Sequence, residues 1–235
     1  MTVAVLVLAA GRGERLGAPV PKAFAPLAGV PLVVRSLAAM ARVREVDRVV
    51  PVVALADRDR FAALAPGLAG IPKLTAPVWG GAERQDSMQA GLASLGPDVD
   101  LVAVHDAARP FVRARDVARV LAAARDVGAA LLAVPVTDTI KRVRAGRVVE
   151  TPERSECWAA QTPQAFRAEV LREALARAAA EGFQATDDVR LVERLGLPVA
   201  VVEGDPGNVK ITRSEDLTAA HARLLDLRAC DEAVR

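Results

Sequence analysis

Residues 8–22 read Leu8-Ala9-Ala10-Gly11-Arg12-Gly13-Glu14-Arg15-Leu16-Gly17-Ala18-Pro19-Val20-Pro21-Lys22. They follow the valine-rich run 3–8, which is typical of a buried strand. The two prolines prevent a regular helix, and the glycines allow sharp turns that leave backbone N–H groups open to a ligand. Such N–H groups beside two arginines and a lysine favour a polyphosphate, so we predict a phosphate-binding loop here.

The spacing of the glycines differs from the two commonest phosphate-binding fingerprints. A dinucleotide-binding loop has the pattern G-x-G-x-x-G, but the third glycine of this loop, Gly17, comes one residue late. A P-loop requires Gly-Lys followed by Ser or Thr, whereas Ala23 follows Lys22. The loop is therefore predicted to bind phosphate without being of either common type.

The composition limits the class of protein. The chain has 235 residues, is 52% hydrophobic and carries a formal net charge of +2, which suits one sizeable core and argues against a nucleic-acid surface. No apolar run is long enough to span a membrane, and the apolar N-terminus lacks the basic segment of a signal peptide. Cys157 and Cys230 match no metal-binding spacing, so a reducing cytoplasm is expected.

Lysine is rare in this chain, and its positions are informative. Only four of the 31 basic residues are lysines, namely Lys22, Lys73, Lys141 and Lys210. An ammonium group is a compact point charge, whereas a guanidinium is a wide fork. In a chain that otherwise uses arginine, a lysine is interpreted as marking a place that needs the compact charge.

Outward from the loop, strand-like and helix-like segments alternate, which predicts an α/β fold of the Rossmann-like, mostly parallel type with helices on both faces. In such a sheet the ligand binds at the carboxyl ends of the strands. Pro66-Gly67 is expected to end one helix, and the main pattern is expected to resume at 161–164, before the helix from Arg167. The expected strands are 3–8, 47–55, 73–78 (weak), 100–105, 129–136 and 197–203, and the expected helices are 31–43, 58–65, 114–127, 167–181, 187–195 and 214–228, with one more that is entered through the glycine turn at 80–88 and runs to about 95.

The alternation breaks at Thr137. Segments 139–144 and 147–151 alternate polar and apolar residues around Ala145-Gly146, which predicts a projecting β-hairpin arm. A two-stranded hairpin is barely stable alone, so we expect it to pack on a second subunit. The sequence thus indicates one domain, 1–235, with a dimerisation arm at about 137–154.

Several motifs together resemble one family, the 2-C-methyl-D-erythritol 4-phosphate cytidylyltransferases of non-mevalonate isoprenoid biosynthesis. The resemblance spans nearly the whole chain, and its specificity lies in the combination and order of the motifs. It implies transfer of CMP from CTP to the sugar phosphate, release of pyrophosphate, a requirement for Mg²⁺, and a homodimer formed through the arm. The motifs are 8–15, Pro21-Lys22, Gly80-Gly81 with Asp86-Ser87, His105-Asp106-Ala107-Ala108-Arg109-Pro110, Thr162-Pro163-Gln164, Thr186-Asp187 and Asn208-Val209-Lys210-Ile211-Thr212.

The resemblance also implies roles for individual residues. Arg15, Lys22 and Lys210 would be catalytic, and Asp106 would lie near the metal. His105 is interpreted as a structural neighbour of Asp106. The nucleotide would be bound by Ala9, Ala10, Gly11, Arg12, Gly13, Gly81 and Ser87, and the methylerythritol phosphate by Asp106, Arg109, Thr162, Lys210 and, from a partner subunit, Thr139 and Arg154.

The residue types support this chemistry independently of the resemblance. A phosphate nucleophile is already ionised at pH 7 and needs no general base, and no catalytic triad is evident. The difficulty is the approach of a dianion to a polyphosphate, which fixed cations relieve. Ala82 stands where relatives often carry an acidic residue, and Ala23 where they often carry glutamine, so base recognition is the part of the prediction that these departures weaken.

Three alternatives remain open at this point. A ribitol 5-phosphate cytidylyltransferase would share the fold and most motifs, although Ala107-Ala108 within the histidine-aspartate motif favours the methylerythritol enzyme. A nucleotide-dependent dehydrogenase is disfavoured by the late third glycine. A non-catalytic sugar-nucleotide sensor of the same fold is disfavoured by the presence of the predicted catalytic cations.

Overall fold

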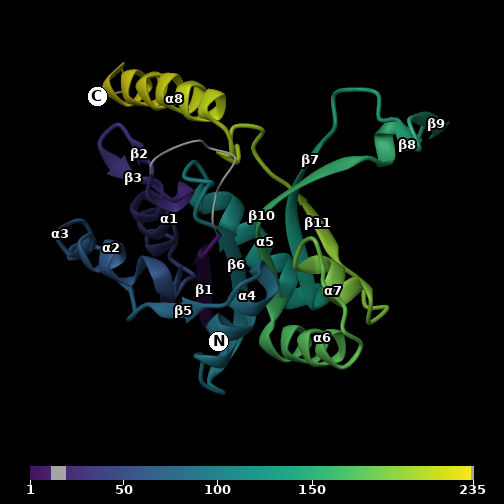
Figure 1. Ribbon diagram of the computed structural model, residues 1–235, viewed down its shortest axis with the longest axis horizontal. Coiled ribbons are helices and arrows are strands. Elements are labelled where there is room, and N and C mark those ends of the chain that lie inside the picture. Colours follow the sequence, from purple (N-terminus) through teal and green to yellow (C-terminus); the bar gives the residue numbers. More distant parts are fainter. Residues whose placement is uncertain (12–19, 234–235) are drawn as a thin grey trace.

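A seven-stranded sheet forms the centre of the protein (Figure 1). The computed structural model describes residues 1–11 and 20–233. In this part of the chain the strand order is β11-β7-β10-β6-β1-β4-β5, and only β10 runs antiparallel to its neighbours. The predicted mostly parallel α/β class is confirmed. The strands are β1 (Thr2–Ala9), β4 (Arg48–Ala54), β5 (Val78–Gly80), β6 (Val99–Asp106), β7 (Ala129–Pro135), β10 (Trp158–Arg167) and β11 (Ala200–Glu203).

Successive side chains of a strand point to opposite faces of the sheet. Because both faces carry apolar side chains, helices cover both of them. On one face Val3, Val5 and Val7 of β1 pack with α1 (Leu32–Ala41), α2 (Arg58–Ala62) and α5 (Ala114–Val127). On the other face Ala4 and Leu6 pack with α4 (Arg84–Ala93), α6 (Ala168–Ala180) and α7 (Val189–Glu193). Among the described residues, no helix has the length and apolar character needed to cross a bilayer.

A third, smaller apolar cluster joins the two ends of the chain. The last helix, α8 (Ser214–Ala233), contributes Ala220, and the segment before it contributes Ile211. They pack with Leu27 and Leu32, which belong to the small hairpin β2 (Pro26–Leu27) and β3 (Val30–Pro31) and to the start of α1. Two members of the cluster lie close to lysines in the sequence. Ala25 directly follows the short helix η2 (Lys22–Phe24), which carries Lys22, and Ile211 directly follows Lys210.

Strand β10 was not predicted: the sequence analysis assigned no strand to the residues where the main pattern resumes. The strand lies between β6 and β7, where it pairs Gln164–Arg167 with Val104–Leu101. Its pairing with β7 shifts between Ala160 and Gln164, around Pro163, which has no N–H to donate. Polar residues and a proline normally argue against a central strand, so the local pattern concealed this one.

Two smaller expectations also need correction. Pro66-Gly67 does not end a helix but lies inside the short helix α3 (Ala65–Leu68), where the proline occupies the first turn and needs no hydrogen-bond donor. The weak strand expected at 73–78 is displaced: β5 covers Val78–Gly80, and Leu74 makes only an isolated bridge to Val49.

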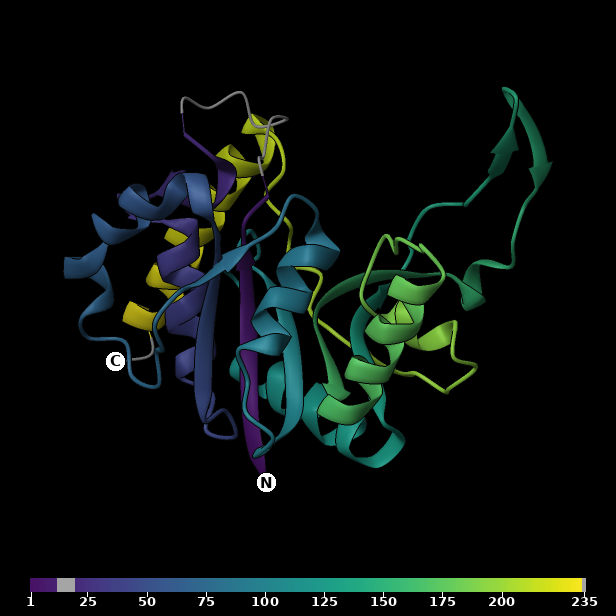
Figure 2. The same ribbon diagram turned by 60° about the horizontal axis from the view of Figure 1, so that its bottom comes forward.

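The predicted arm is present as a separate hairpin of β8 (Arg142–Arg144) and β9 (Arg147–Glu150). Figure 2 shows it extending away from the sheet and its helices. Ala145 and Gly146 form its turn with positive φ angles of 48° and 75°. Val143 and Val148 are 55% and 60% exposed, so this single chain leaves the apolar face of the arm uncovered.

The register of the sheet determines where a ligand can bind. β1 pairs with β6 on one side and with β4 on the other. The strands that follow β1 in the sequence are therefore placed first on one side of it and then on the other. A switch point of this kind opens a crevice at the carboxyl ends of the strands. Leu8 pairs with Asp106, which places the start of the phosphate loop level with the end of β6.

Gly91 allows α4 to approach the sheet closely. A Cβ at this position would lie 3.0 Å from Leu6 Cδ1 and 3.0 Å from Val52 Cγ2, both on buried strand residues. We expect Gly91→Leu to lower the free energy of unfolding by about 1–3 kcal/mol, as overpacking does. The matched control is Ala93→Leu on the exposed side of the same helix. Equal denaturation midpoints for the two variants would contradict this packing.

Candidate active site

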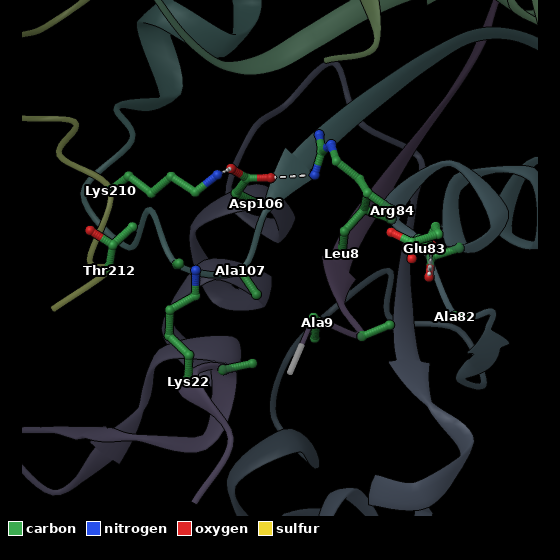
Figure 3. Close-up of a pocket in the computed structure, with 15 residues that line it drawn as sticks. Leu8, Ala9, Lys22, Ala82, Glu83, Arg84, Asp106, Ala107, Lys210 and Thr212 are labelled. Atoms are coloured by element: carbon green, nitrogen blue, oxygen red, sulfur yellow. Dashed lines mark hydrogen bonds and ion pairs between the residues drawn. The ribbon is translucent and has the colours of Figure 1, made fainter. Parts of the chain in front are cut away.

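A cavity of about 740 Å³ opens at the carboxyl ends of β1 and β6 (Figure 3). Its walls come from the start of the phosphate loop, the entry to α4, the end of β6 and the segment before α8. The charged side chains among its described lining residues are Lys22, Glu83, Arg84, Asp106 and Lys210. All of these except Glu83 form the centre of the site. The lining residues are Leu8, Ala9, Ala10, Gly11, Lys22, Ala23, Ala82, Glu83, Arg84, Ser87, Asp106, Ala107, Ala108, Lys210 and Thr212.

Asp106 is held between two cations. Its Oδ1 lies 2.5 Å from Arg84 Nη1 and its Oδ2 lies 2.6 Å from Lys210 Nζ. Burial alone would raise the pKa of this carboxyl, but Arg84 and Lys210 outweigh burial and hold the pKa well below its ordinary value. Asp106 is therefore ionised at any pH near neutrality.

Arg84 and Asp188 are site residues that the sequence analysis missed. Arg84 Nη2 lies 2.6 Å from Asp188 Oδ2, so the guanidinium joins two buried carboxylates. Burial opposes the charge of Arg84, but Asp188 and Asp106 raise its pKa above the ordinary value, whereas burial raises the pKa of Asp188. The sequence offered one signal for this pair, because Asp188 directly follows the Thr186-Asp187 motif.

Asp188 is positioned by the unpredicted strand. Gln164 of β10 accepts hydrogen bonds through Oε1 from the backbone N–H groups of Asp188 (3.0 Å) and Val189 (2.9 Å), at the start of α7. These N–H groups would otherwise have no partner within the helix. The side chain of Gln164 thus fixes the start of α7 and, with it, the carboxylate that binds Arg84.

The two lysines enter the cavity from the side opposite Arg84 and Glu83, as Figure 3 shows. Lys22 comes from η2, and Lys210 comes from the segment between β11 and α8. The third apolar cluster supports both, through Ala25 next to η2 and through Ile211 next to Lys210. The site therefore brings together cations from opposite ends of the sequence.

The remaining wall is shaped by small residues. A Cβ on Gly80 would lie 2.6 Å from Ser87 Oγ and 2.8 Å from the Cβ of Ala10, so only glycine allows this approach. A Cβ on Gly81 would collide with the Cβ of Asp86. Ala9, Ala10, Gly11 and Ser87 line the cavity, whereas the candidates Arg12, Gly13 and Arg15 lie outside the described residues.

Five other candidates are not among the described lining residues, and one of them, Gly81, directly precedes the lining residue Ala82. Arg109 donates to the carbonyl oxygens of Asn208 (2.7 Å) and Ala160 (3.3 Å), and desolvation on burial lowers its pKa. Thr162 is buried behind the end of β6. The exposed residues Thr139 and Arg154 belong to the arm, and Arg154 Nη1 donates to the carbonyl oxygen of Thr137 at 3.2 Å.

His105 is also buried behind the cavity. Desolvation on burial lowers the pKa of its imidazole to about 4, so the ring is neutral at pH 7. Its Nδ1 lies 3.1 Å from Thr162 Oγ1, and its Nε2 lies 3.1 Å from the carbonyl oxygen of Arg109.

A mostly parallel α/β sheet with a cationic cavity at the β1–β6 switch point defines the class, which is that of the α/β nucleotidyltransferases. Residues 3–226 match the family model for 2-C-methyl-D-erythritol 4-phosphate cytidylyltransferase, and the chain belongs to this family of enzymes of the non-mevalonate pathway.

Relatives and solved structures agree with this assignment. The family enzyme of Symbiobacterium thermophilum is 47% identical, over 94% of this chain and 92% of the relative. The crystal structure of 4-diphosphocytidyl-2C-methyl-D-erythritol synthase from Anaerococcus prevotii matches with a TM-score of 0.84 and 30% identity, over 95% of this chain and 98% of that chain. The structure of the family enzyme from Thermus thermophilus matches with a TM-score of 0.75 and 37% identity, over 94% of this chain and 98% of that chain.

Replacing Asp188 tests the anchoring of Arg84. In Asp188→Asn the buried guanidinium keeps only one carboxylate, so we expect the free energy of unfolding to fall by about 2 kcal/mol, the range for a hydrogen bond to a charged group. The kcat/KM for cytidylyl transfer should fall as well. Glu193→Gln, an exposed carboxylate on the same helix, is the control and should change stability by less than about 0.5 kcal/mol. Identical unfolding curves for both variants would show that the pair does not matter.

Proposed function

We propose that this cavity is where CMP passes from CTP to 2-C-methyl-D-erythritol 4-phosphate. A phosphate oxygen of the acceptor attacks the α-phosphorus of CTP, the bond from that phosphorus to the bridging oxygen of the β-phosphate breaks, and pyrophosphate leaves with the bonding electrons. The observation that carries the assignment is Asp106, held ionised between Arg84 and Lys210 beside the phosphate loop.

The cations supply the electrostatic part of this chemistry. The attacking oxygen is already ionised, so the barrier comes from bringing two polyanions together and from the charge that grows around phosphorus. We assign Lys22 and Lys210 to stabilising that charge, because both line the cavity. Arg15 is assigned the same role from the family motif, and Arg12 and Gly13 are assigned to the triphosphate on the same ground.

The nucleotide base is assigned to the glycine wall. Gly80 and Gly81 let the backbone approach Ala10, Asp86 and Ser87 more closely than any other residue would, and Ser87 lines the cavity. Ala82 lacks the acidic group that relatives often carry there, but the next residue, Glu83, also lines the cavity. A cytosine could therefore meet Ser87 and the backbone at 80–82, with Glu83 as the nearby carboxylate.

The described residues of this site offer two carboxylates as possible ligands for Mg²⁺. The carboxylates of the described lining residues are Asp106 and Glu83, and the described residues include no cluster of three or more side chains suited to a metal. Mg²⁺ commonly binds through one or two carboxylates together with substrate phosphates, which suits Asp106 as its protein ligand. When bound, Mg²⁺ would neutralise part of the triphosphate charge, while Lys210 and Arg84 keep the carboxylate ionised and in place.

The arm is proposed to complete the acceptor site of a second subunit. Its exposed valines need a covering surface, and Thr139 and Arg154 stand on it, away from the cavity of their own chain. A two-fold symmetric dimer would bring each arm to the cavity of its partner. Arg109, which is tied to Asn208, would shape the same acceptor site from within the chain.

The reaction is tested by pyrophosphate release from each of the four nucleoside triphosphates. Release should be fastest with CTP and should require methylerythritol phosphate and a divalent cation. Ribitol 5-phosphate is the competing acceptor in parallel assays. A preference for ribitol 5-phosphate, or equal rates with all four nucleotides, would contradict the assignment.

Lysine at position 210 should not be replaceable by arginine. Its ammonium lies 2.6 Å from Asp106 Oδ2, and a guanidinium is wider and favours forked contacts. We expect Lys210→Arg to lower kcat by about 10²-fold, as loss of a preorganised donor does. Lys73→Arg is the control, since Lys73 lies away from the cavity and binds the carbonyl oxygen of Val43. Full activity in Lys210→Arg would contradict a need for a compact charge.

Mixing two inactive variants tests whether the arm serves a neighbour. Arg154→Ala damages the arm and Lys22→Ala damages the cavity, so a mixed dimer has one site with both lesions and one with neither. Random exchange makes half of the dimers mixed, and recovered activity should approach about a quarter of wild type. Mass measurement must confirm exchange. No recovery from confirmed mixed dimers would mean that the arm serves its own subunit or only holds the dimer together.

A further inference from the structure

His105 and Thr162 form a buried pair behind Asp106 to which the reaction described above gives no task. His105 is fully buried and immediately precedes Asp106 on β6, and Thr162 is 5% exposed on β10. Thr162 is not among the described residues that line the cavity. The pair therefore lies one layer behind the site, in contact with the backbone that carries Asp106.

The direction of each proton in this pair follows from chemistry. A carbonyl oxygen can only accept, so the contact between His105 Nε2 and the carbonyl oxygen of Arg109 places the ring proton on Nε2. The other nitrogen of the neutral ring, Nδ1, is then an acceptor, and the Thr162 hydroxyl must donate to it. The oxygen of Thr162 in turn accepts from the backbone N–H of Asp106 at 3.0 Å.

We propose that His105 and Thr162 are positioning residues, which fix the backbone of Asp106, and that the Thr162 proton is committed to His105 and is not offered to the acceptor phosphate. The inference rests on the proposed function, because it concerns how Asp106 serves that site. It changes the role that the family resemblance implies for Thr162, from a residue that binds the methylerythritol phosphate to one that accepts a hydrogen bond from the Asp106 N–H and holds β6.

The consequence for activity comes through Asp106. Its carboxylate aligns Lys210 and Arg84, so a shift of its backbone shifts both cations. Misplacement by about 1 Å can cost about 10²-fold in rate. The bond between Thr162 and the Asp106 N–H acts at the end of β6, on the side where the ladder with β10 reaches only Gln164 and Val104.

Thr162→Val and Thr162→Ser provide the matched test, because valine keeps the shape and serine keeps the hydroxyl. We expect Thr162→Val to lower kcat/KM for the acceptor by about tenfold or more, and Thr162→Ser to stay within about threefold of wild type. A merely structural role would instead lower the unfolding temperature of both without separating their kinetics.

The double variant tests whether the two residues act as one unit. His105→Phe replaces the imidazole with a slightly larger aromatic ring that can make neither hydrogen bond. If the pair is a unit, His105→Phe combined with Thr162→Val should lose no more activity than the worse single variant. Additive losses would overturn the coupling.

The proton positions are testable on the wild-type enzyme by nitrogen NMR of the histidine rings. The chain has only two histidines, and His221 provides the reference. Its Nε2 accepts from the backbone N–H of Ala28 (3.1 Å) and its Nδ1 lies 2.9 Å from the carbonyl oxygen of Leu217, so the protonated nitrogen is Nδ1. We expect the two rings to show opposite tautomers, with the Nε2–H ring lost in His105→Phe. A proton on Nδ1 of His105 would overturn the inference.

Failure of this inference and failure of the proposed function give different results. If the wild-type enzyme releases no pyrophosphate from CTP and methylerythritol phosphate, the proposed function is wrong. If the wild type is active but Thr162→Val and Thr162→Ser have equal kcat/KM, the function stands and the positioning role is wrong.

Discussion

The site depends on one buried carboxylate that two cations share. Asp106 binds Arg84 and Lys210, and Arg84 is anchored in turn by Asp188. Moving such charges out of water is costly, so an arrangement of this kind persists only when each charge has its partner. The placement of α4, β6, α7 and the segment before α8 is therefore constrained by a single set of ion pairs, and a displacement of one element disturbs the others.

Strand β10 holds this arrangement together through its three buried polar side chains. Gln161 donates to the carbonyl oxygen of Asp205 and accepts from Asn208, which fixes the turn that leads to Lys210. Thr162 binds the end of β6, and Gln164 binds the start of α7. An irregular strand can do this because a break in its ladder changes the direction in which its side chains point.

The sequence predicted the regular parts well, for physical reasons. Buried parallel strands such as β1 and β6 are continuous apolar runs, and α5 carries a clear helical period ended by Gly128. The cavity lining around Lys22, Asp106 and Lys210 followed from motifs. Arg84, Asp188 and β10 did not, because their roles come from partners distant in sequence, and a proline among polar residues conceals a strand.

The third apolar cluster has a consequence for the order in which the enzyme is assembled. Lys22 follows the first strand and Lys210 precedes the last helix, and they are brought to one cavity when α8 packs against β2, β3 and α1. A chain emerging from the ribosome can form β1, β4 and β6 long before this contact exists. The charge centre is therefore completed only after all seven strands of the sheet have been made, so a nascent chain carries a nearly finished sheet before it has this site.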